Sequence, residues 1–169
     1  MKKLLGVAAL LVALAAFAVT AAAADTGGTD RPFTATLAGE ASAVPDSSCP
    51  FPPGVRTYTE ASGVTSHLGL VSVTGSHCPL LDGRSVDGQT TLVAANGDEL
   101  YMTYEGVSDP VGIPEPGTVI TFMSDNVIVG GTGRFASATG EVDVTVLVTF
   151  TGLGTPWPFT MTWDGAISY

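Results

Sequence analysis

The 169-residue sequence predicts an all-β protein of seven or eight antiparallel strands. Apolar and polar residues alternate along most of the chain after Asp25, and this period of two is typical of half-buried strands. In that region no stretch of ten residues keeps apolar side chains at helical spacing, and the connections are short or rich in proline. Parallel strands need long crossover connections, usually helices, so the strands are expected to pair in antiparallel fashion.

Residues 1–24 have the pattern of a secretory signal peptide. Lys2 and Lys3 precede an apolar run over residues 4–19, and Ala22 and Ala24 supply the small residues that a signal peptidase requires. Cleavage after residue 24 would leave residues 25–169 as a single domain of a secreted or periplasmic protein. An uncleaved membrane anchor is the alternative, because the run approaches the roughly 20 apolar residues that span a bilayer.

The composition excludes several classes of protein. Hydrophobic residues make up 45% of the chain and charged residues only 13%, which excludes a disordered acidic tail. The 16 acidic residues outnumber the 6 basic ones and give a net charge of −10, so a nucleic-acid backbone would be repelled. We therefore expect no nucleic-acid partner and, after removal of the signal peptide, no membrane partner, because anionic lipids would repel the same surface.

The cysteine content predicts one disulfide. Cys49 and Cys78 are the only two cysteines, and in an exported domain two thiols usually form a bridge. The bridge would close a loop of 29 residues, for which the chain-entropy model gives about 3 to 4 kcal/mol of stabilisation. The alternatives are two free thiols or a metal site that includes His77, which has too few ligands nearby.

The strands follow from the alternation, taken in chain order. The clearest is residues 141–150, where Val142, Val144, Val146 and Val148 form one apolar face. The full set of predicted strands is residues 32–37, 64–74, 86–95, 99–106, 118–129, 141–150 and 159–168, with residues 55–60 as the candidate for an eighth.

The connections between these strands carry turn residues. Asn96-Gly97 predicts a tight hairpin between two neighbouring strands, because this dipeptide accepts positive φ values. Residues 46–54, 110–117 and 151–156 are expected to be irregular loops rich in proline or glycine. Strands with one apolar face each can form a sandwich or a closed barrel, and the period of two does not distinguish these architectures.

A glycine-rich segment decides between the two. Residues 130–140, Gly-Gly-Thr-Gly-Arg-Phe-Ala-Ser-Ala-Thr-Gly, resemble the Gly-Gly-Thr-Gly-x-Phe-x-x-Ala-x-Gly signature of dirigent proteins and allene oxide cyclases. Residues 66–69 and 94–100 look like other recurring elements of exported bacterial proteins with such a barrel. The resemblance covers about residues 33–169 and implies a single closed antiparallel eight-stranded β-barrel with an apolar lumen. Enzymes and non-enzymatic guides of radical coupling share this fold, so the resemblance does not transmit an activity.

The same segment also resembles a dinucleotide-binding loop. Ala136 stands where the third glycine of that loop belongs, and the next strand follows too soon to leave room for a helix, so no cofactor is expected. In the structural interpretation the glycines allow positive φ and close backbone approach, Phe135 plugs one end of the barrel, and Arg134 ties the turn to a carboxylate. A loop that gates the lumen is the alternative. The glycines that the structural interpretation assigns to positive φ and close backbone approach are Gly130, Gly131 and Gly133.

Three residues are candidates to face a ligand in the lumen. His67 shares the parity of Val71 and Val73 on the strand predicted at residues 64–74, and Tyr104 and Trp163 lie on apolar faces of their strands. Core aromatics with polar tips at a rim are the alternative interpretation. The two histidines have no acid cluster nearby, so no metal site is expected. No catalytic residue of the resembling families can be matched by position, so catalytic residues stay unassigned.

Together these features predict a secreted barrel that binds an apolar small molecule in its lumen or serves as an extracellular scaffold. A cofactor-independent cyclase or isomerase, or a dirigent-like guide of a coupling reaction, is the alternative, and the sequence leaves open whether the protein is an enzyme. A homo-oligomer is a third expectation, because Leu147 interrupts an otherwise polar strand face.

Overall fold

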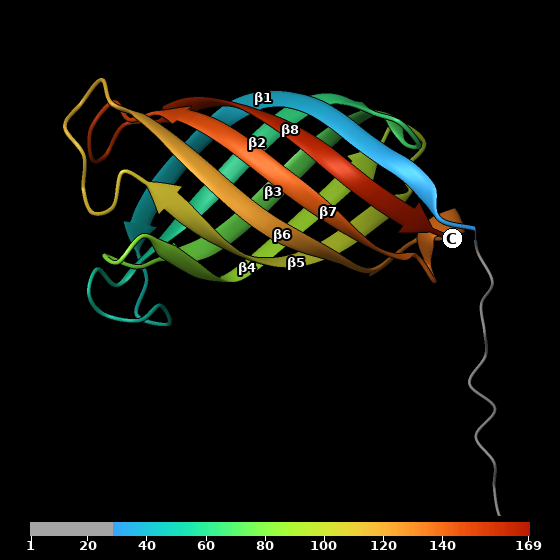
Figure 1. Cartoon of the computed structure of the whole chain (residues 1–169), viewed down its shortest axis with the longest axis horizontal. Helices are drawn as coiled ribbons and strands as arrows, with labels where there is room; N and C mark the ends of the chain where they lie inside the picture. Colours follow the sequence, from blue (N-terminus) through green and yellow to red (C-terminus); the bar gives the residue numbers. More distant parts are fainter. Residues whose placement is uncertain (1–28) are drawn as a thin grey trace, which may run out of the picture.

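The alternating strands close into a barrel, as Figure 1 shows for the computed structural model, which describes residues 29–169. Each strand pairs antiparallel with the next, and β1 pairs with β8 to complete the cylinder. The predicted all-β fold with eight antiparallel strands in one closed barrel is confirmed. The signal peptide predicted over residues 1–24 lies outside the described residues. The elements are β1 (Arg31–Pro45), β2 (Val55–Thr65), β3 (Gly69–Pro79), β4 (Arg84–Ala94), β5 (Glu99–Asp109), β6 (Val119–Gly131), the 3-10 helix η1 (Gly133–Phe135), β7 (Thr139–Thr149) and β8 (Trp157–Ser168).

One predicted strand is wrong. Residues 64–74 do not form a single strand, because β2 ends at Thr65 and β3 begins at Gly69. Gly69 has a φ of 72°, which glycine adopts readily, and the backbone N–H of Leu68 donates to Thr65 Oγ1 at 3.1 Å within the turn. The inward residues Thr65, before the turn, and Val71, after it, have the same parity, so the period of two did not reveal the break. The candidate eighth strand at residues 55–60 is real and belongs to β2.

The first strand is longer than predicted. β1 continues to Pro45 through a run of small residues that have a low intrinsic preference for strands. Its second half pairs with β2 up to Pro45 and with β8 up to Ala41. Pairing on both sides therefore overrides the low strand preference of these residues. Sequence patterns alone do not contain this pairing and so underestimate the length of β1.

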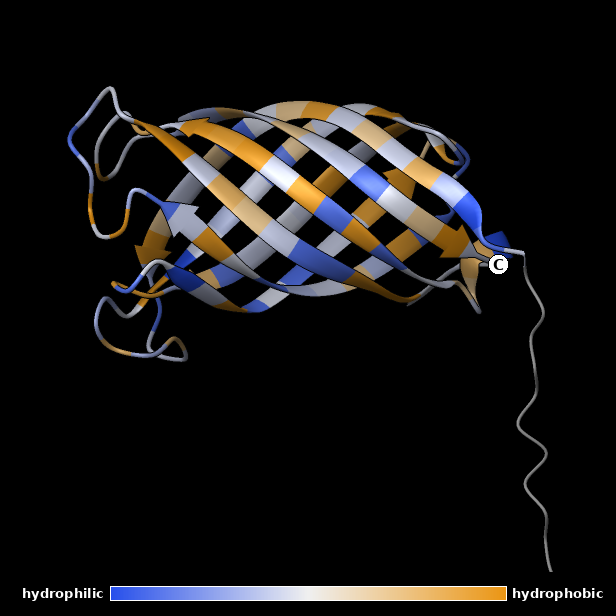
Figure 2. Ribbon diagram, viewed as in Figure 1, coloured by the Kyte–Doolittle hydropathy of each residue, from blue (hydrophilic) through white to orange (hydrophobic). Residues whose placement is uncertain are grey.

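Figure 2 shows the alternation of apolar and polar residues along the strands of the barrel. On β7, Val142, Val144 and Val146 are buried inside the barrel, whereas the residues between them, Asp143 and Thr145, are exposed. The apolar rows therefore face the lumen, and most polar rows face solvent.

The two ends of the barrel carry different kinds of connection between strands. At the end that holds the C-terminus, the β2–β3 and β4–β5 turns are short, and η1 folds against the opening (Figure 1). The opposite end carries the longer loops at residues 46–54, 110–118 and 150–156, and also the short turn at residues 80–83. We call the end that holds the C-terminus the closed end and the opposite end, with the longer loops, the open end. Within residues 29–169, no helix is long and apolar enough to cross a membrane.

A disulfide joins Cys49 in the β1–β2 loop to Cys78 near the end of β3 at the open end, with the two Cα atoms 5.4 Å apart. This bridge confirms the predicted pairing. Disulfides form and persist in oxidising compartments, so the bridge indicates a location outside the cytoplasm.

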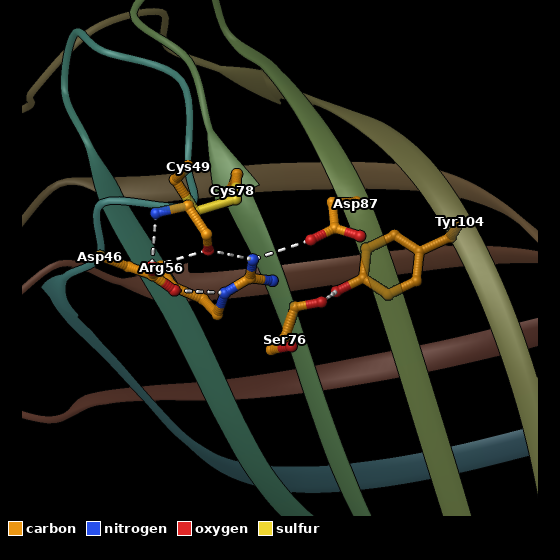
Figure 3. A network of polar contacts seen from close by, with 8 residues as sticks. Asp46, Cys49, Arg56, Ser76, Cys78, Asp87 and Tyr104 are labelled. Carbon is orange, nitrogen blue, oxygen red and sulfur yellow. Dashed lines mark hydrogen bonds and ion pairs between the residues drawn. A yellow bond between two sulfur atoms is a disulfide. The ribbon is translucent and has the colours of Figure 1, made fainter.

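An arginine network supports the same loop, as Figure 3 shows. Arg56 Nε on β2 lies 2.8 Å from Asp46 Oδ2, and Arg56 Nη2 lies 2.8 Å from Asp87 Oδ2 at the bulge in β4. Hydrogen bonds from Ser48 and Arg56 lower the pKa of Asp46 to about 2. The loop over residues 46–54 is therefore held by charge pairs as well as by the covalent bridge.

Candidate functional site

The barrel holds a cavity of about 540 Å³ that is lined from the open-end loops to the middle of the strands. Leu81, Ile113 and Leu153 line it at the loops, and Trp163, midway along β8, lines its inner part. This volume lies in the range of pockets that hold small molecules. The candidate site is therefore the lumen itself, approached through the open end.

Aromatic rings lie along one side of the cavity. His77 on β3 stacks on Phe122 from β6, with ring centroids 5.2 Å apart and planes 4° apart. The Tyr104 ring from β5 meets both rings edge-on, at 5.9 Å from His77 and 6.2 Å from Phe122. The three rings form one cluster, which we call the aromatic cluster.

Two glycines inside strands make room for this cluster. A Cβ atom added at Gly88 on β4 would lie 2.6 Å from Tyr104 Cε2, and one added at Gly106 on β5 would lie 2.7 Å from Phe122 Cε2. Both rings therefore rest directly on the backbone of the barrel wall, where any larger residue would push them inward. The cavity stays open because the rings lie against the wall.

The hydrogen bonds of the aromatic cluster orient His77. The Tyr104 hydroxyl lies 2.9 Å from His77 Nδ1 and donates to the carbonyl oxygen of Ser76 at 3.3 Å (Figure 3). Both contacts are hydrogen bonds at the same time only when the tyrosine hydrogen points to Ser76 and Nδ1 carries a proton that it donates to the tyrosine oxygen. Nε2 is then an acceptor. Within residues 29–169, Ser85 Oγ is the one side-chain nitrogen or oxygen that is both fully buried and without a hydrogen-bond partner. His77 Nε2 is therefore not fully buried, and it borders the cavity that the ring lines.

The cavity is electrically neutral. Burial and, to a smaller extent, the positive charge of Arg56 together lower the pKa of His77 to about 4. The ring is half-buried by surface area because one edge borders the cavity, yet protein surrounds it on the other sides. Burial also raises the pKa of Tyr104, so both groups are uncharged at neutral pH. Among the cavity-lining residues of the described chain, only Arg84 carries a charge, and it pairs with Asp82 at 2.8 Å.

The two halves of the lumen differ in polarity. The half formed by β2 to β6 carries hydroxyl and amide groups as well as the aromatic cluster. These polar lining residues are Thr57, Thr59, Thr90, Ser108, Ser124 and Asn126. The half formed by β7, β8 and β1 presents only apolar or indole side chains among its described lining residues. The indole N–H groups there are already engaged, because Trp163 Nε1 donates to Met161 Sδ at 2.9 Å and Trp157 Nε1 donates to the Gly152 carbonyl at 2.8 Å.

The structure brings two of the three predicted lumen residues to the cavity. Tyr104 and Trp163 both line it. The placement predicted for His67 on an inward strand face is wrong, because this residue lies in the β2–β3 turn at the closed end. Its ring stacks near Phe33, with centroids 6.2 Å apart, and His67 Nε2 lies 2.9 Å from the Pro32 carbonyl oxygen.

The glycine-rich segment lies at the closed end, away from the cavity. The Phe135 side chain is 0% exposed, and its ring packs against the Tyr169 ring with centroids 4.8 Å apart. Arg134 donates to the His67 carbonyl, and its Nε lies 3.9 Å from Asp98 Oδ2. Positive φ values occur at two of the three glycines, Gly130 and Gly133, and Gly131 approaches the Glu99 backbone closely.

Sequence reasoning missed the histidine that faces the cavity. Sequence reasoning considered His77 only as part of a metal site, and it did not single out Phe122 or Asn126. Gly88 and Gly106 were the available signal, because glycine inside a strand marks a place where another group approaches the backbone.

The chain was compared with family models, with curated proteins and with solved structures, and none of them matches it. Within residues 29–169, no group of three or more histidine, cysteine or acidic side chains is placed to hold a metal ion.

Proposed function

We propose that this protein binds a neutral, largely apolar small molecule in the lumen of its barrel. The observation that carries the proposal is the cavity of about 540 Å³, which opens at one end of a barrel whose other end is filled with side chains. The resemblance of residues 130–140 to dirigent proteins and allene oxide cyclases supports it, since it implies a barrel with an apolar lumen. The disulfide and the predicted signal peptide support the proposal that the ligand is bound outside the cytoplasm.

Desolvation would supply most of the affinity. Burial of apolar surface contributes roughly 25 cal/mol per Å², so a ligand that buries roughly 200 Å² of apolar surface gains about 5 kcal/mol before the cost of immobilisation. The neutral lumen contributes no ion pair, because its charged group, Arg84, is already paired with Asp82. A charged ligand would lose its hydration without gaining a partner.

The test uses Nile red, a neutral apolar dye whose fluorescence rises on transfer from water. Ala43 on β1 lines the cavity, whereas its neighbour Ser42 is exposed on the outer face. Ala43→Trp would fill part of the lumen, and Ser42→Trp is the matched control with the same added side chain. We expect the wild type and Ser42→Trp to bind the dye with affinities within about twofold, and Ala43→Trp to bind at least about tenfold more weakly. Equal binding by all three proteins would place the dye outside the lumen and overturn the proposal.

A second candidate function is proton transfer on a bound ligand, as in a cofactor-independent isomerase or cyclase. The observation that favours it is His77 Nε2, an acceptor that borders the cavity and is oriented by Tyr104. In this reaction Nε2 would take a proton from the carbon next to a carbonyl group and return it to another carbon, so no redox partner is needed.

The test of this second candidate is deuterium uptake from D₂O into a β,γ-unsaturated ketone, followed by mass spectrometry. We expect uptake with the wild type and none above the uncatalysed rate with His77→Gln, which should still bind Nile red. Absence of uptake with the wild type, under conditions where the ketone displaces Nile red, would leave binding without turnover.

A further inference from the structure

The uneven lumen defines the chemistry of the ligand more closely. Its apolar half offers no free hydrogen-bonding group on β7, β8 and β1, and its polar half offers several from β2 to β6. We propose that the ligand is a neutral hydrocarbon skeleton with at least one hydroxyl or carbonyl oxygen on one edge, and that His77 and Asn126 anchor this edge. The inference rests on the proposed binding function and specifies the ligand class.

Asn126 is the first anchor. Its side chain is 3% exposed and lines the cavity, and its Oδ1 accepts a hydrogen bond from Ser124 Oγ at 2.7 Å. Within the described residues this is the one hydrogen bond of the Asn126 side chain, so the amide N–H₂ borders the cavity with its donors unused. The amide nitrogen is not enclosed by protein, so it can donate to a group bound in the cavity. A carbonyl or hydroxyl oxygen of the ligand would satisfy it.

His77 is the second anchor and has the opposite hydrogen-bonding character. Because Nδ1 is engaged with Tyr104, Nε2 can accept from a ligand hydroxyl. The ring is fixed by its stack on Phe122, so the acceptor has a defined direction. A donor at Asn126 and an acceptor at His77 together match an oxygenated edge and do not match a plain hydrocarbon.

A pair of threonines extends the polar half. Gly75 on β3 pairs with Thr59 on one side and with Thr90 on the other. A Cβ atom at Gly75 would lie 2.7 Å from Thr59 Oγ1 and 3.5 Å from Thr90 Oγ1, so the Thr59 hydroxyl packs directly on the glycine and the Thr90 hydroxyl lies beside it. Thr90 is 8% exposed, and both threonines line the cavity. Their two hydroxyls offer further hydrogen-bonding partners to a second oxygen on the same edge of the ligand.

An anionic ligand such as a fatty acid does not fit this arrangement. A carboxylate needs a cation or several donors, and the single lining cation, Arg84, is paired with Asp82 and largely exposed. The uncharged donors and acceptors deeper in the lumen suit an alcohol or a ketone better than an ion.

The experiment compares three probes that share one ring system: pyrene, 1-hydroxypyrene and 1-pyrenebutyric acid. Binding is followed by quenching of the tryptophan emission and by displacement of Nile red. For the wild type we expect 1-hydroxypyrene to bind at least about tenfold more tightly than pyrene, and 1-pyrenebutyric acid to bind more weakly than 1-hydroxypyrene. Equal affinity for pyrene and 1-hydroxypyrene, or tighter binding of the acid, would overturn the inference.

Variants then assign the preference to the anchors. His77→Phe keeps an aromatic ring for the stack, and Asn126→Leu keeps the side-chain shape, so both remove hydrogen bonding with little change of volume. The preference for 1-hydroxypyrene over pyrene should fall to about threefold or less in at least one of them, with pyrene affinity retained. Thr145→Val, on the exposed face of β7, is the control and should keep the full preference. Retention of the preference in both anchor variants would overturn the inference, whereas failure of all three probes to bind the wild type would overturn the binding function itself.

Discussion

At the closed end of the barrel the inward side chains fill the interior, whereas at the open end they leave it empty. Phe33, Phe135 and Ile167 are each 0% exposed at the closed end, and Tyr169 packs on Phe135. At the open end, Tyr104 and Phe122 pack against glycines of the wall and border the cavity. Aromatic residues therefore form a plug at one end and line a pocket at the other.

The two ends also differ in what stabilises their connections. The turn that carries η1 packs Phe135 into the core, so burial holds it in place. The loop at residues 46–54 has little such core, and its Phe51 side chain is 87% exposed. The disulfide and the Arg56 ion pairs fix this loop instead. A barrel end that keeps a cavity gives up core burial, and covalent and ionic links replace part of that stabilisation.

The largest change in the free energy of unfolding should come from replacing a phenylalanine by alanine at the closed end, compared with the same replacement at the open end. Phe135→Ala removes a fully buried ring, so we expect the free energy of unfolding to fall by about 3 to 5 kcal/mol. Phe51→Ala removes an exposed ring and should change it by less than about 0.5 kcal/mol. Urea unfolding followed by tryptophan fluorescence measures both. Equal losses for the two variants would mean that the ends do not differ in core burial.

The next largest effect tests the covalent link at the open end. The double variant Cys49→Ala, Cys78→Ala should lose about 3 to 4 kcal/mol, because the unfolded chain regains the freedom of a 29-residue loop. The wild type unfolded in the presence of a reductant is the control and should match the variant. A variant as stable as the oxidised wild type would show that the loop does not depend on its bridge.

The pH dependence of stability should also distinguish the two ends, because an ionisable ring, His77, is buried beside the cavity at the open end. Burial lowers the pKa of His77 from 6.5 to about 4, so between these pH values the unfolded chain binds a proton that the folded chain does not. The stability is therefore complete above pH 6.5 and falls as the pH falls towards 4, by roughly 3 kcal/mol at most. Urea unfolding at several pH values should show a shallower dependence for His77→Gln than for the wild type. Parallel curves for the two proteins would contradict the assignment.

The smallest effect concerns a polar group with no partner near the open end. Ser85 on β4 is 1% exposed, and its Oγ has no hydrogen-bond partner among residues 29–169. Ser85→Ala should leave the free energy of unfolding unchanged or raise it by up to about 1 kcal/mol, because an unsatisfied hydroxyl is removed. Ser42→Ala on the exposed face of β1 is the control. A clear loss of stability for Ser85→Ala alone would reveal a hydrogen bond that this geometry does not contain.

Much of the fold could be predicted because the barrel depends on a local pattern. The alternation at residues 141–150 gave β7 almost to the residue, and Asn96-Gly97 gave the β4–β5 hairpin. The break at residues 66–68 could not be predicted in this way, because the inward residues before and after the turn, Thr65 and Val71, have the same parity. His67 was therefore assigned to the lumen, although it lies at the closed end.

The candidate site was predicted only in part. Tyr104 and Trp163 were identified from their inward parity, and both line the cavity. His77 lies where the β3–β4 register shifts, between Ser76 and Cys78, and simple parity is unreliable at such a bulge. Its neighbour Phe122 comes from β6, so only closure of the barrel brings the two rings together.

By itself the sequence determined which residues face inward, because a strand turns successive side chains to opposite faces whatever surrounds it. Only the tertiary structure decided whether those inward residues meet and fill the space or leave it open. That outcome depends on the side chains carried by strands across the barrel and on glycines such as Gly88 and Gly106 that let rings rest on the wall. Such distances between distant segments are not encoded in any local period, so the pocket emerges only when β1 pairs with β8.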